Sequence, residues 1–258
     1  MSGEPEIRVF EDPAAVSEAA ARIIADGLES AVAHRGRADW ATTGGSTPVG
    51  VYRVLRAAPL RDDVPWADVH VWWGDDRFVR RDDPLSNVRP LDELLRAPGA
   101  GVPLDPANVH APAMDGAIDA GRGAETVAAA YAAELRAARL PIGGAGFPML
   151  DVILLGIGGD GHLLSVFPGS PLFDSVAWVS AVPAPTHIEP RVARVSLNPA
   201  MLTAARRVVV VAHGNGKATI LATVLGAERD ERRWPAQVAR RGNATWLLDR
   251  AAASSLAG

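Results

Sequence analysis

Residues 151–162, DVILLGIGGDGH, carry the clearest structural signal in the chain. The first part of this stretch is an apolar run ending at Leu155, and four glycines follow within the next six residues. A short apolar run bounded by glycine is typical of a strand that is buried on both faces. Glycines allow tight turns and close approach of the backbone to another group, so the loop after this strand is expected to lie against a ligand.

Outward from this stretch, strands and helices alternate along the whole chain. Strands are predicted at residues 6–10, 38–43, 69–73, 151–155, 207–212 and 245–248, and helices at 13–33, from 47 onward, at 86–96, 123–139 and 216–225. This alternation predicts a single domain over residues 1–258, an α/β fold with an open, mostly parallel, doubly wound sheet and helices on both faces. Residues 98–119 are predicted to be mostly loop. Ligands are expected beyond the carboxyl ends of the strands.

Composition and charge exclude several classes of protein. The chain has 258 residues, a net charge of −4, six histidines and no cysteine. Disulfides, thiolate metal sites and a cysteine nucleophile are therefore excluded, and the histidines lack the spacing of metal ligands, so no metal is expected. The negative charge argues against a nucleic-acid partner. The acidic, proline-broken N-terminus does not resemble a signal peptide, and no stretch of about 18 apolar residues is present, so we expect a cytoplasmic protein with no membrane partner.

A glycine turn follows the strand predicted at residues 38–43. Gly44 and Gly45 allow a tight turn, and Ser46 and Thr47 supply hydroxyl groups at the start of the next helix. We expect Thr47 to cap this helix and Pro48 to occupy its first position. Free N–H groups at a helix N-terminus favour anions, so the turn is a candidate phosphate site. An ordinary strand–turn–helix connection explains the same residues equally well.

Two further strand ends carry charged or polar residues. Asp75, Asp76 and Arg77 come directly after the strand VHVWW, and Asn87 follows a little later. These side chains are candidates for orienting one another or for holding a sugar. Taken alone, a solvated turn is the simpler interpretation of this segment.

The loop after Leu155 contains the strongest catalytic candidates. His162 is the side chain best suited to accept a proton near neutral pH, and Asp160, two residues earlier, is placed to fix its tautomer. The competing interpretation as a dinucleotide-binding loop is disfavoured, because the glycines do not form G-x-G-x-x-G before a helix and Pro168 interrupts the segment. A purely structural glycine loop remains the alternative.

Basic residues complete the candidate site. Arg191 and Arg194 precede the segment Val195-Ser196-Leu197, and Lys217 follows the strand RVVVVA within GNGKA. Arginine binds phosphate with a planar fork and lysine binds it as a point charge. Each of these residues alone is more often found on a surface, but together with the Gly44–Thr47 turn they predict a phosphate site.

The ordered set TTGGSTP, GDDRFV, LLGIGGDGHLLSVFPGS, RVSLN and GNGKA resembles the 6-phosphogluconolactonase family and, more distantly, the glucosamine-6-phosphate deaminases. The resemblance covers nearly the whole chain, and the DGH loop with its SVFPG continuation is its most specific part. The chain departs from the lactonase pattern at two positions. It has Asp76 where that family usually has Glu, and Leu163 where that family usually has Thr or Ser. Of the two arginines, Arg194 fits the family spacing better than Arg191.

This resemblance implies an enzyme of the oxidative pentose phosphate pathway that hydrolyses a phosphosugar lactone without a metal or an organic cofactor. On this hypothesis His162 activates water, and Asp160 or a loop carbonyl orients the ring of His162. Arg77, positioned by Asp75, would stabilise the developing negative charge or hold sugar hydroxyls. The phosphate would be held by Gly44, Gly45, Ser46, Thr47, Arg194 and Lys217, with Asn87 also in contact with substrate. We expect a monomer or a weak homo-oligomer.

Two other functions remain open at this stage. One is an amino-sugar phosphate deaminase, and the other is a sugar-phosphate-binding module without catalysis. The resemblance bears on the first, because the deaminases typically carry Glu five residues after the histidine, whereas Phe167 occupies that position here. A phenyl ring can neither carry charge nor accept a proton. The presence of both His162 and Arg77 argues against the second.

Overall fold

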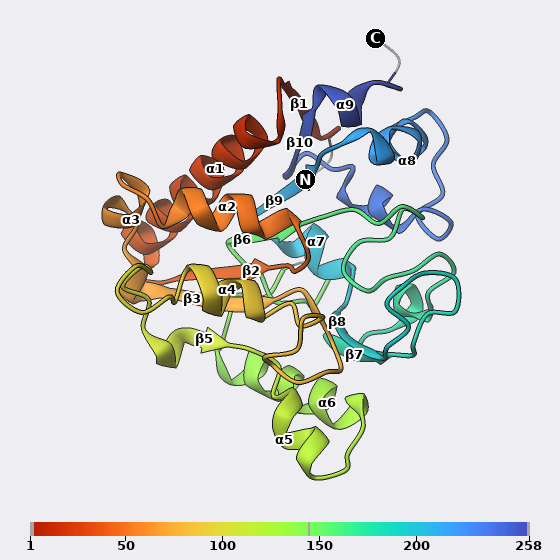
Figure 1. The fold of residues 1–258 in the computed structure, drawn as a ribbon. Coiled ribbons are helices and arrows are strands. Elements are labelled where there is room, and N and C mark those ends of the chain that lie inside the picture. The colour runs from red at the N-terminus through yellow and green to blue at the C-terminus, as the bar shows by residue number, and fades with distance from the viewer. Residues whose placement is uncertain (1–2, 144, 257–258) are drawn as a thin grey trace.

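The computed structural model describes residues 3–143 and 145–256, and a seven-stranded sheet lies at its centre (Figure 1). In spatial order its strands are β1 (Glu6–Phe10), β10 (Ala244–Asp249), β9 (Arg207–Ala212), β6 (Val152–Leu155), β2 (Ala38–Thr42), β3 (Val69–Trp73) and β5 (Val109–His110). Every neighbouring pair in this sheet runs parallel. The prediction of an open, mostly parallel sheet is confirmed.

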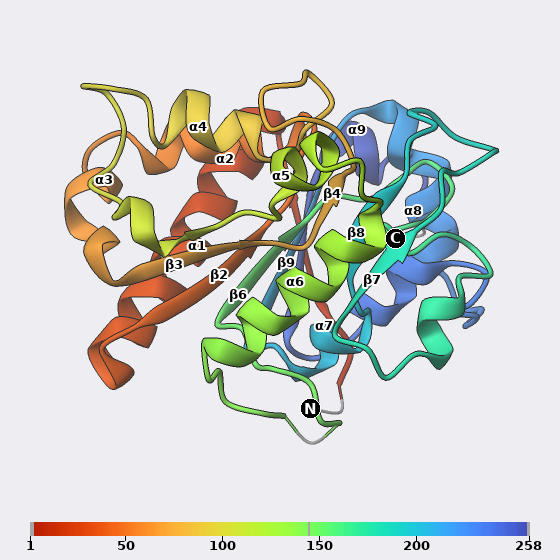
Figure 2. The same ribbon diagram turned by 90° about the horizontal axis from the view of Figure 1, so that it is seen from below.

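Helices cover both faces of the sheet, as Figure 1 shows for α1 and α2 above β2 and β3 and for α6 below them. Figure 2 gives the view from the α6 side. The first group of helices comprises α1 (Pro13–Arg35), α2 (Thr47–Leu55), α3 (Leu60–Asp63) and α4 (Arg89–Leu94). The second comprises α5 (Met114–Asp119), α6 (Ala124–Ala137), α7 (Ala200–Ala204), α8 (Ala218–Val224) and α9 (Arg250–Ala253). None of the helices in the described ranges is long and apolar enough to cross a membrane.

The two faces of the sheet form two separate apolar cores. Successive side chains of a strand point to opposite faces. In β3, Val71 and Trp73 pack with the helices of the first group, whereas Trp72 packs with those of the second. The apolar runs that mark the inner strands in the sequence follow from this arrangement, because neither side of those strands faces water, whereas the edge strand β1 is largely exposed.

A second sheet, with three antiparallel strands, is not anticipated by the sequence pattern. It consists of β4 (Asp75–Arg77), β8 (Arg194–Leu197) and β7 (Val179–Val182). The strands are short, and β4 consists entirely of charged residues, so no apolar run marks it as a strand. Pairing places Arg77 directly opposite Arg194, although the two residues are far apart in the sequence.

Several predicted boundaries are wrong. The helix expected at 86–96 is shorter and spans Arg89–Leu94, and the N–H group of Asn87, just before it, donates to the Asp76 carboxylate. Ser46, not Thr47, occupies the cap position of α2, and its side chain makes no capping hydrogen bond. The helix expected from 216 begins at Ala218, after a short 3-10 turn. The stretch 98–119, expected to be mostly loop, is largely irregular and also contains β5 and α5.

The order of the strands creates a crevice beside β2. After β2 the chain builds β3 and β5 on one side, and it then returns through α6 to place β6 on the other side of β2. The loops that leave β2 and β6 therefore diverge at the carboxyl edge of the sheet. Ligands of open α/β sheets bind at such a point, where the direction of winding changes.

Candidate active site

A polar cavity of about 240 Å³ lies at this crevice. Its walls come from loops that follow β2, β3, β6 and β9 and from the start of β8. The site residues predicted from the sequence line it, with the exception of Asp160 and of the candidates Asp76 and Arg191. The lining residues are Thr43, Gly44, Gly45, Ser46, Thr47, Asp75, Arg77, Asn87, Gly156, Ile157, Gly158, His162, Leu163, Leu164, Arg194 and Lys217.

The turn after β2 is tightly packed against two other segments. A Cβ atom on Gly44 would lie 1.8 Å from Oδ1 of Asn87, and one on Gly156 would lie 2.7 Å from Oγ1 of Thr47. Gly45 has a φ of +74°, a left-handed conformation that favours glycine. The glycines therefore let three loops meet closely and leave the N-terminus of α2, a helix of nine residues, at the cavity wall.

Asp75 and Asn87 form a buried pair at one side of the cavity. Nδ2 of Asn87 donates to the Asp75 carbonyl oxygen at 2.8 Å, and Oγ of Ser165 donates to Oδ2 of Asp75 at 2.5 Å. Oδ1 of Asn87 is buried and has no hydrogen-bond partner among the described residues. The Asp75 carboxylate thus contacts Ser165 and Asn87, and no hydrogen bond joins it to the guanidinium of Arg77 in the described part of the chain. Oδ1 of Asn87 lies against Gly44, in the space that a Cβ atom there would occupy.

Two arginines lie side by side on the small antiparallel sheet. Arg77 donates to the Leu85 carbonyl oxygen at 2.8 Å and Arg194 to the Pro190 carbonyl oxygen at 3.1 Å. In the described residues, Nε of each arginine is buried without a hydrogen-bond partner. Burial, together with the positive charge of Arg77, lowers the pKa of Arg194, and the charge of Asp75 partly offsets this. Two guanidinium groups that line the cavity make this wall suited to an anion.

Of the two arginines that the sequence offered as alternatives, Arg194 lines the cavity and Arg191 does not. The Arg191 side chain is 64% exposed and forms an ion pair with Glu189. Lys217 lies across the cavity, where its Nζ donates to the Ile157 carbonyl oxygen at 2.8 Å. Burial lowers the pKa of Lys217, and the charge of Asp160 opposes that effect.

His162 is the only histidine among the residues that line this cavity. Its Nδ1 donates to Oδ1 of Asp160 at 2.5 Å, which leaves Nε2 as the ring nitrogen able to accept a proton. Burial opposes ionisation of Asp160, but hydrogen bonds from His162 and His187 hold the pKa of its carboxyl well below its usual range. Gly158 makes this geometry possible, because a Cβ atom there would lie 2.0 Å from Nδ1 of His162.

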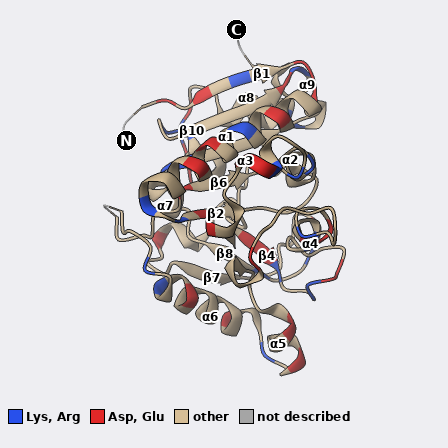
Figure 3. Cartoon of the chain, turned by 90° about the vertical axis from the view of Figure 1, so that its left-hand side faces the viewer, with Lys and Arg blue, Asp and Glu red and all other residues tan. Residues whose placement is uncertain are grey.

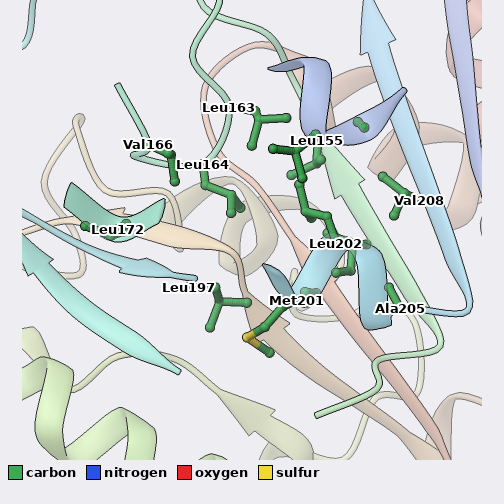
Figure 4. Packing of buried hydrophobic residues seen from close by; sticks show 14 of the residues in the cluster. Leu155, Leu163, Leu164, Val166, Leu172, Leu197, Met201, Leu202, Ala205 and Val208 are labelled. Carbon is green, nitrogen blue, oxygen red and sulfur yellow. The ribbon is translucent and has the colours of Figure 1, made fainter. Parts of the chain in front are cut away.

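Apolar side chains fix the loop that carries His162. Leu163 and Leu164 are buried, and Figure 4 shows both turned into the core that contains Leu155 and Leu197. Leu164 has a φ of +54°, and the chain reverses here so that Ser165 reaches Asp75. The ring of Phe167 lies 4.8 Å from the His162 ring. This loop is therefore part of the core rather than a surface connection.

Two residues of the site are absent from the sequence-based prediction. Ser165 belongs to the SVFPG continuation, so its motif was visible, but its contact with Asp75 depends on the fold. His187 donates from Nε2 to Oδ2 of Asp160 at 2.9 Å. No local pattern in the sequence links His187 to residues 25 or more positions away. Among the described residues, no group of three or more His, Cys, Asp or Glu is arranged to hold a metal ion.

Together, these features define a class of protein: an α/β enzyme whose cavity offers cationic groups and a helix N-terminus to an anionic small molecule, beside one oriented histidine. Residues 11–247 match the family model described as glucosamine-6-phosphate isomerases/6-phosphogluconolactonase. The chain belongs to this family.

Individual relatives and solved structures agree with this assignment. The 6-phosphogluconolactonase of Streptomyces coelicolor is 39% identical, over 99% of this chain and 96% of that protein. The structure of 6-phosphogluconolactonase from Trypanosoma brucei has a TM-score of 0.84 at 29% identity and covers 99% of this chain and 100% of that one. A monomeric glucosamine-6-phosphate deaminase has a TM-score of 0.78 at 19% identity, covering 97% and 99% of the two chains, which shows a shared fold.

Proposed function

We propose that this chain hydrolyses 6-phospho-D-glucono-1,5-lactone to 6-phospho-D-gluconate, in the oxidative pentose phosphate pathway. The observation that carries the proposal is the His162–Asp160 pair at the edge of a cavity walled by Arg77, Arg194 and Lys217. The relatives named 6-phosphogluconolactonase support the same substrate. We infer that residues 1–258 act as one domain, as a monomer or weak homo-oligomer in the cytoplasm, with no nucleic-acid partner.

The proposed reaction uses water and one histidine. Nε2 of His162 takes a proton from water as the water oxygen attacks the lactone carbonyl carbon. The tetrahedral intermediate then collapses, the bond to the ring oxygen breaks, and the imidazolium returns the proton to that oxygen. The product is an open-chain acid. Because the lactone is an activated ester, this proton transfer and correct placement of the substrate suffice, and no covalent intermediate is required.

The cationic wall has two proposed tasks. Arg194, Lys217 and the turn from Gly44 to Thr47 hold the phosphate, whose binding energy orients the lactone for attack. Arg77, whose side chain lines the cavity, stabilises the oxyanion or binds a sugar hydroxyl. Asp75 has a different proposed task from the one predicted: it holds Asn87 and Ser165, and so fixes the part of the cavity wall where Asn87 contacts substrate.

The deaminase alternative meets a specific obstacle at Phe167. In the deaminases a glutamate at the corresponding position supports the histidine during proton transfer. Here a phenyl ring lies 4.8 Å from the His162 ring and supplies no acceptor for a proton. The proposed activity is therefore hydrolysis rather than deamination.

The direct test is a lactonase assay on freshly generated 6-phosphogluconolactone, corrected for spontaneous hydrolysis. Protein treated with a chelator is expected to accelerate hydrolysis well above the buffer rate and to release no ammonia from glucosamine 6-phosphate. Robust deamination would refute the choice of lactonase. An inactive protein that zinc restores would refute the metal-free mechanism.

A further inference from the structure

The carboxylate of Asp160 lies between two histidines. Its Oδ1 accepts from Nδ1 of His162, and its Oδ2 accepts from Nε2 of His187 at 2.9 Å. His187 belongs to the segment between β7 and β8 and does not line the cavity. Its effect on any reaction in the cavity must therefore pass through a neighbouring side chain.

His187 is fixed by a second contact, although its side chain is 47% exposed. Its ring lies edge-on to Phe167, with 5.6 Å between ring centroids and an angle of 89° between planes. Phe167 in turn contacts the His162 ring and lies beneath the guanidinium of Arg194 at 5.2 Å. His187 is thus packed against Phe167 and hydrogen-bonded to Asp160, and both of these side chains contact the ring of His162.

We infer that His187 is a positioning residue for the hydrolysis proposed above, acting on His162 through Asp160. This inference rests on the proposed roles of His162 and Asp160. A carboxylate turns readily about its last side-chain bond. Anchoring Oδ2 to His187 stops this rotation and keeps Oδ1 on Nδ1 of His162. The proton then stays on Nδ1, and Nε2 remains the base that faces water.

The same arrangement affects the pH dependence of catalysis. The charged and titratable groups that face Asp160 are His162, His187, Arg194 and Lys217. The carboxylate of Asp160 stabilises the imidazolium of His162 only while its Oδ1 stays on Nδ1, and His187 holds it there. Loss of His187 lets the carboxylate turn away and weakens that contact. The acidic limb of the kcat profile, which reports protonation of the base, is then expected to move to lower pH.

Two substitutions separate the hydrogen bond from the packing. His187→Phe keeps an aromatic ring against Phe167 but removes the donor, and His187→Gln keeps a donor within reach of Asp160. We expect kcat on 6-phosphogluconolactone to fall about 10-fold in His187→Phe, with KM nearly unchanged and the acidic limb displaced to lower pH. His187→Gln is expected to recover most of kcat. His34→Gln, an exposed change on α1, serves as the control.

A double-mutant cycle with Asp160→Ala completes the test, with circular dichroism confirming that each variant is folded. If His187 acts through Asp160, His187→Phe has no further effect in the Asp160→Ala background. Additive effects, a change in KM alone, or a wild-type kcat and pH profile in His187→Phe would each overturn the inference. His162→Ala, measured in parallel, tests the proposed function separately: near-normal turnover there would refute the role of His162 itself.

Discussion

In the proposed reaction, the imidazole of His162 acts as a base while Asp160 holds the proton on its Nδ1 atom. We expect His162→Ala to lower kcat by roughly 10²-fold or more, the usual effect of removing a general base. The residual rate would reflect substrate orientation by the cationic wall. The measurement is steady-state lactone hydrolysis above the spontaneous rate, with a thermal melt to confirm folding. A well-folded variant with near-normal kcat would contradict the assignment.

The phosphate contacts can be tested by comparing two substrates. Lys217→Ala or Arg194→Ala should reduce kcat/KM for 6-phosphogluconolactone about 10- to 100-fold, as expected for loss of a charge-assisted hydrogen bond, while changing kcat/KM for unphosphorylated gluconolactone far less. Arg191→Ala is the matched control, because Arg191 is exposed and outside the cavity. If both lactones lose activity in the same ratio, the residue does not bind phosphate.

Asp76 gives stability a predictable dependence on pH. Burial raises its pKa from 3.8 to about 7, although N–H groups of Asn87 and Arg77 oppose the shift. The folded state therefore binds this proton more tightly than the unfolded state does. The resulting stabilisation is fully present below about pH 4 and is lost as the pH rises to about 7, by up to about 4 kcal/mol.

Asp76→Asn removes this titration and keeps an oxygen that can accept both N–H groups. The free energy of unfolding, measured with urea at several pH values between about 4 and 8, should therefore fall less steeply with pH in Asp76→Asn than in the wild type. Parallel curves for the two proteins would show that Asp76 does not titrate in this range.

At the scale of elements, the loop after β6 offers a matched pair of glycines. Gly158→Ala places a Cβ atom against His162, whereas a Cβ atom on the adjacent Gly159 meets nothing within 4 Å. We expect Gly158→Ala to lower kcat about 10²-fold by displacing the imidazole, and Gly159→Ala to remain close to wild type. Equal activity of the two variants would mean that the loop has room to move His162 without loss.

The sequence was sufficient for elements that are buried on both faces. Continuous apolar runs mark β6 and β9, and glycine motifs mark the loops that build the cavity. It was insufficient for β4, because a charged strand of three residues has no periodic pattern and is defined by pairing with β8. His187 was missed for a related reason. Its contact with Asp160 depends on where a long connection returns, and that is a property of the tertiary fold.

At the scale of the whole molecule, both cores use the same sheet, so they are expected to unfold together. Trp73 reports on one core and Trp246 on the other. Urea unfolding followed by tryptophan fluorescence and by far-ultraviolet circular dichroism should give coincident transitions. Separate midpoints would contradict a single domain. The cartoon in Figure 3 shows Lys and Arg interspersed with Asp and Glu along the helices and loops around the sheet.

Because β2 must pair with β6, the recovery of enzymatic activity during refolding reports when these two strands have come together. Trp40 lies opposite Val152 in this pair. Two strands that are more than a hundred residues apart in the sequence must therefore pair before the crevice exists. Contacts this distant in sequence form slowly, because a long loop must close first. During refolding, helices will return early and catalysis late. The delay between the recovery of helical structure and the recovery of activity would measure the time that β2 and β6 need to pair.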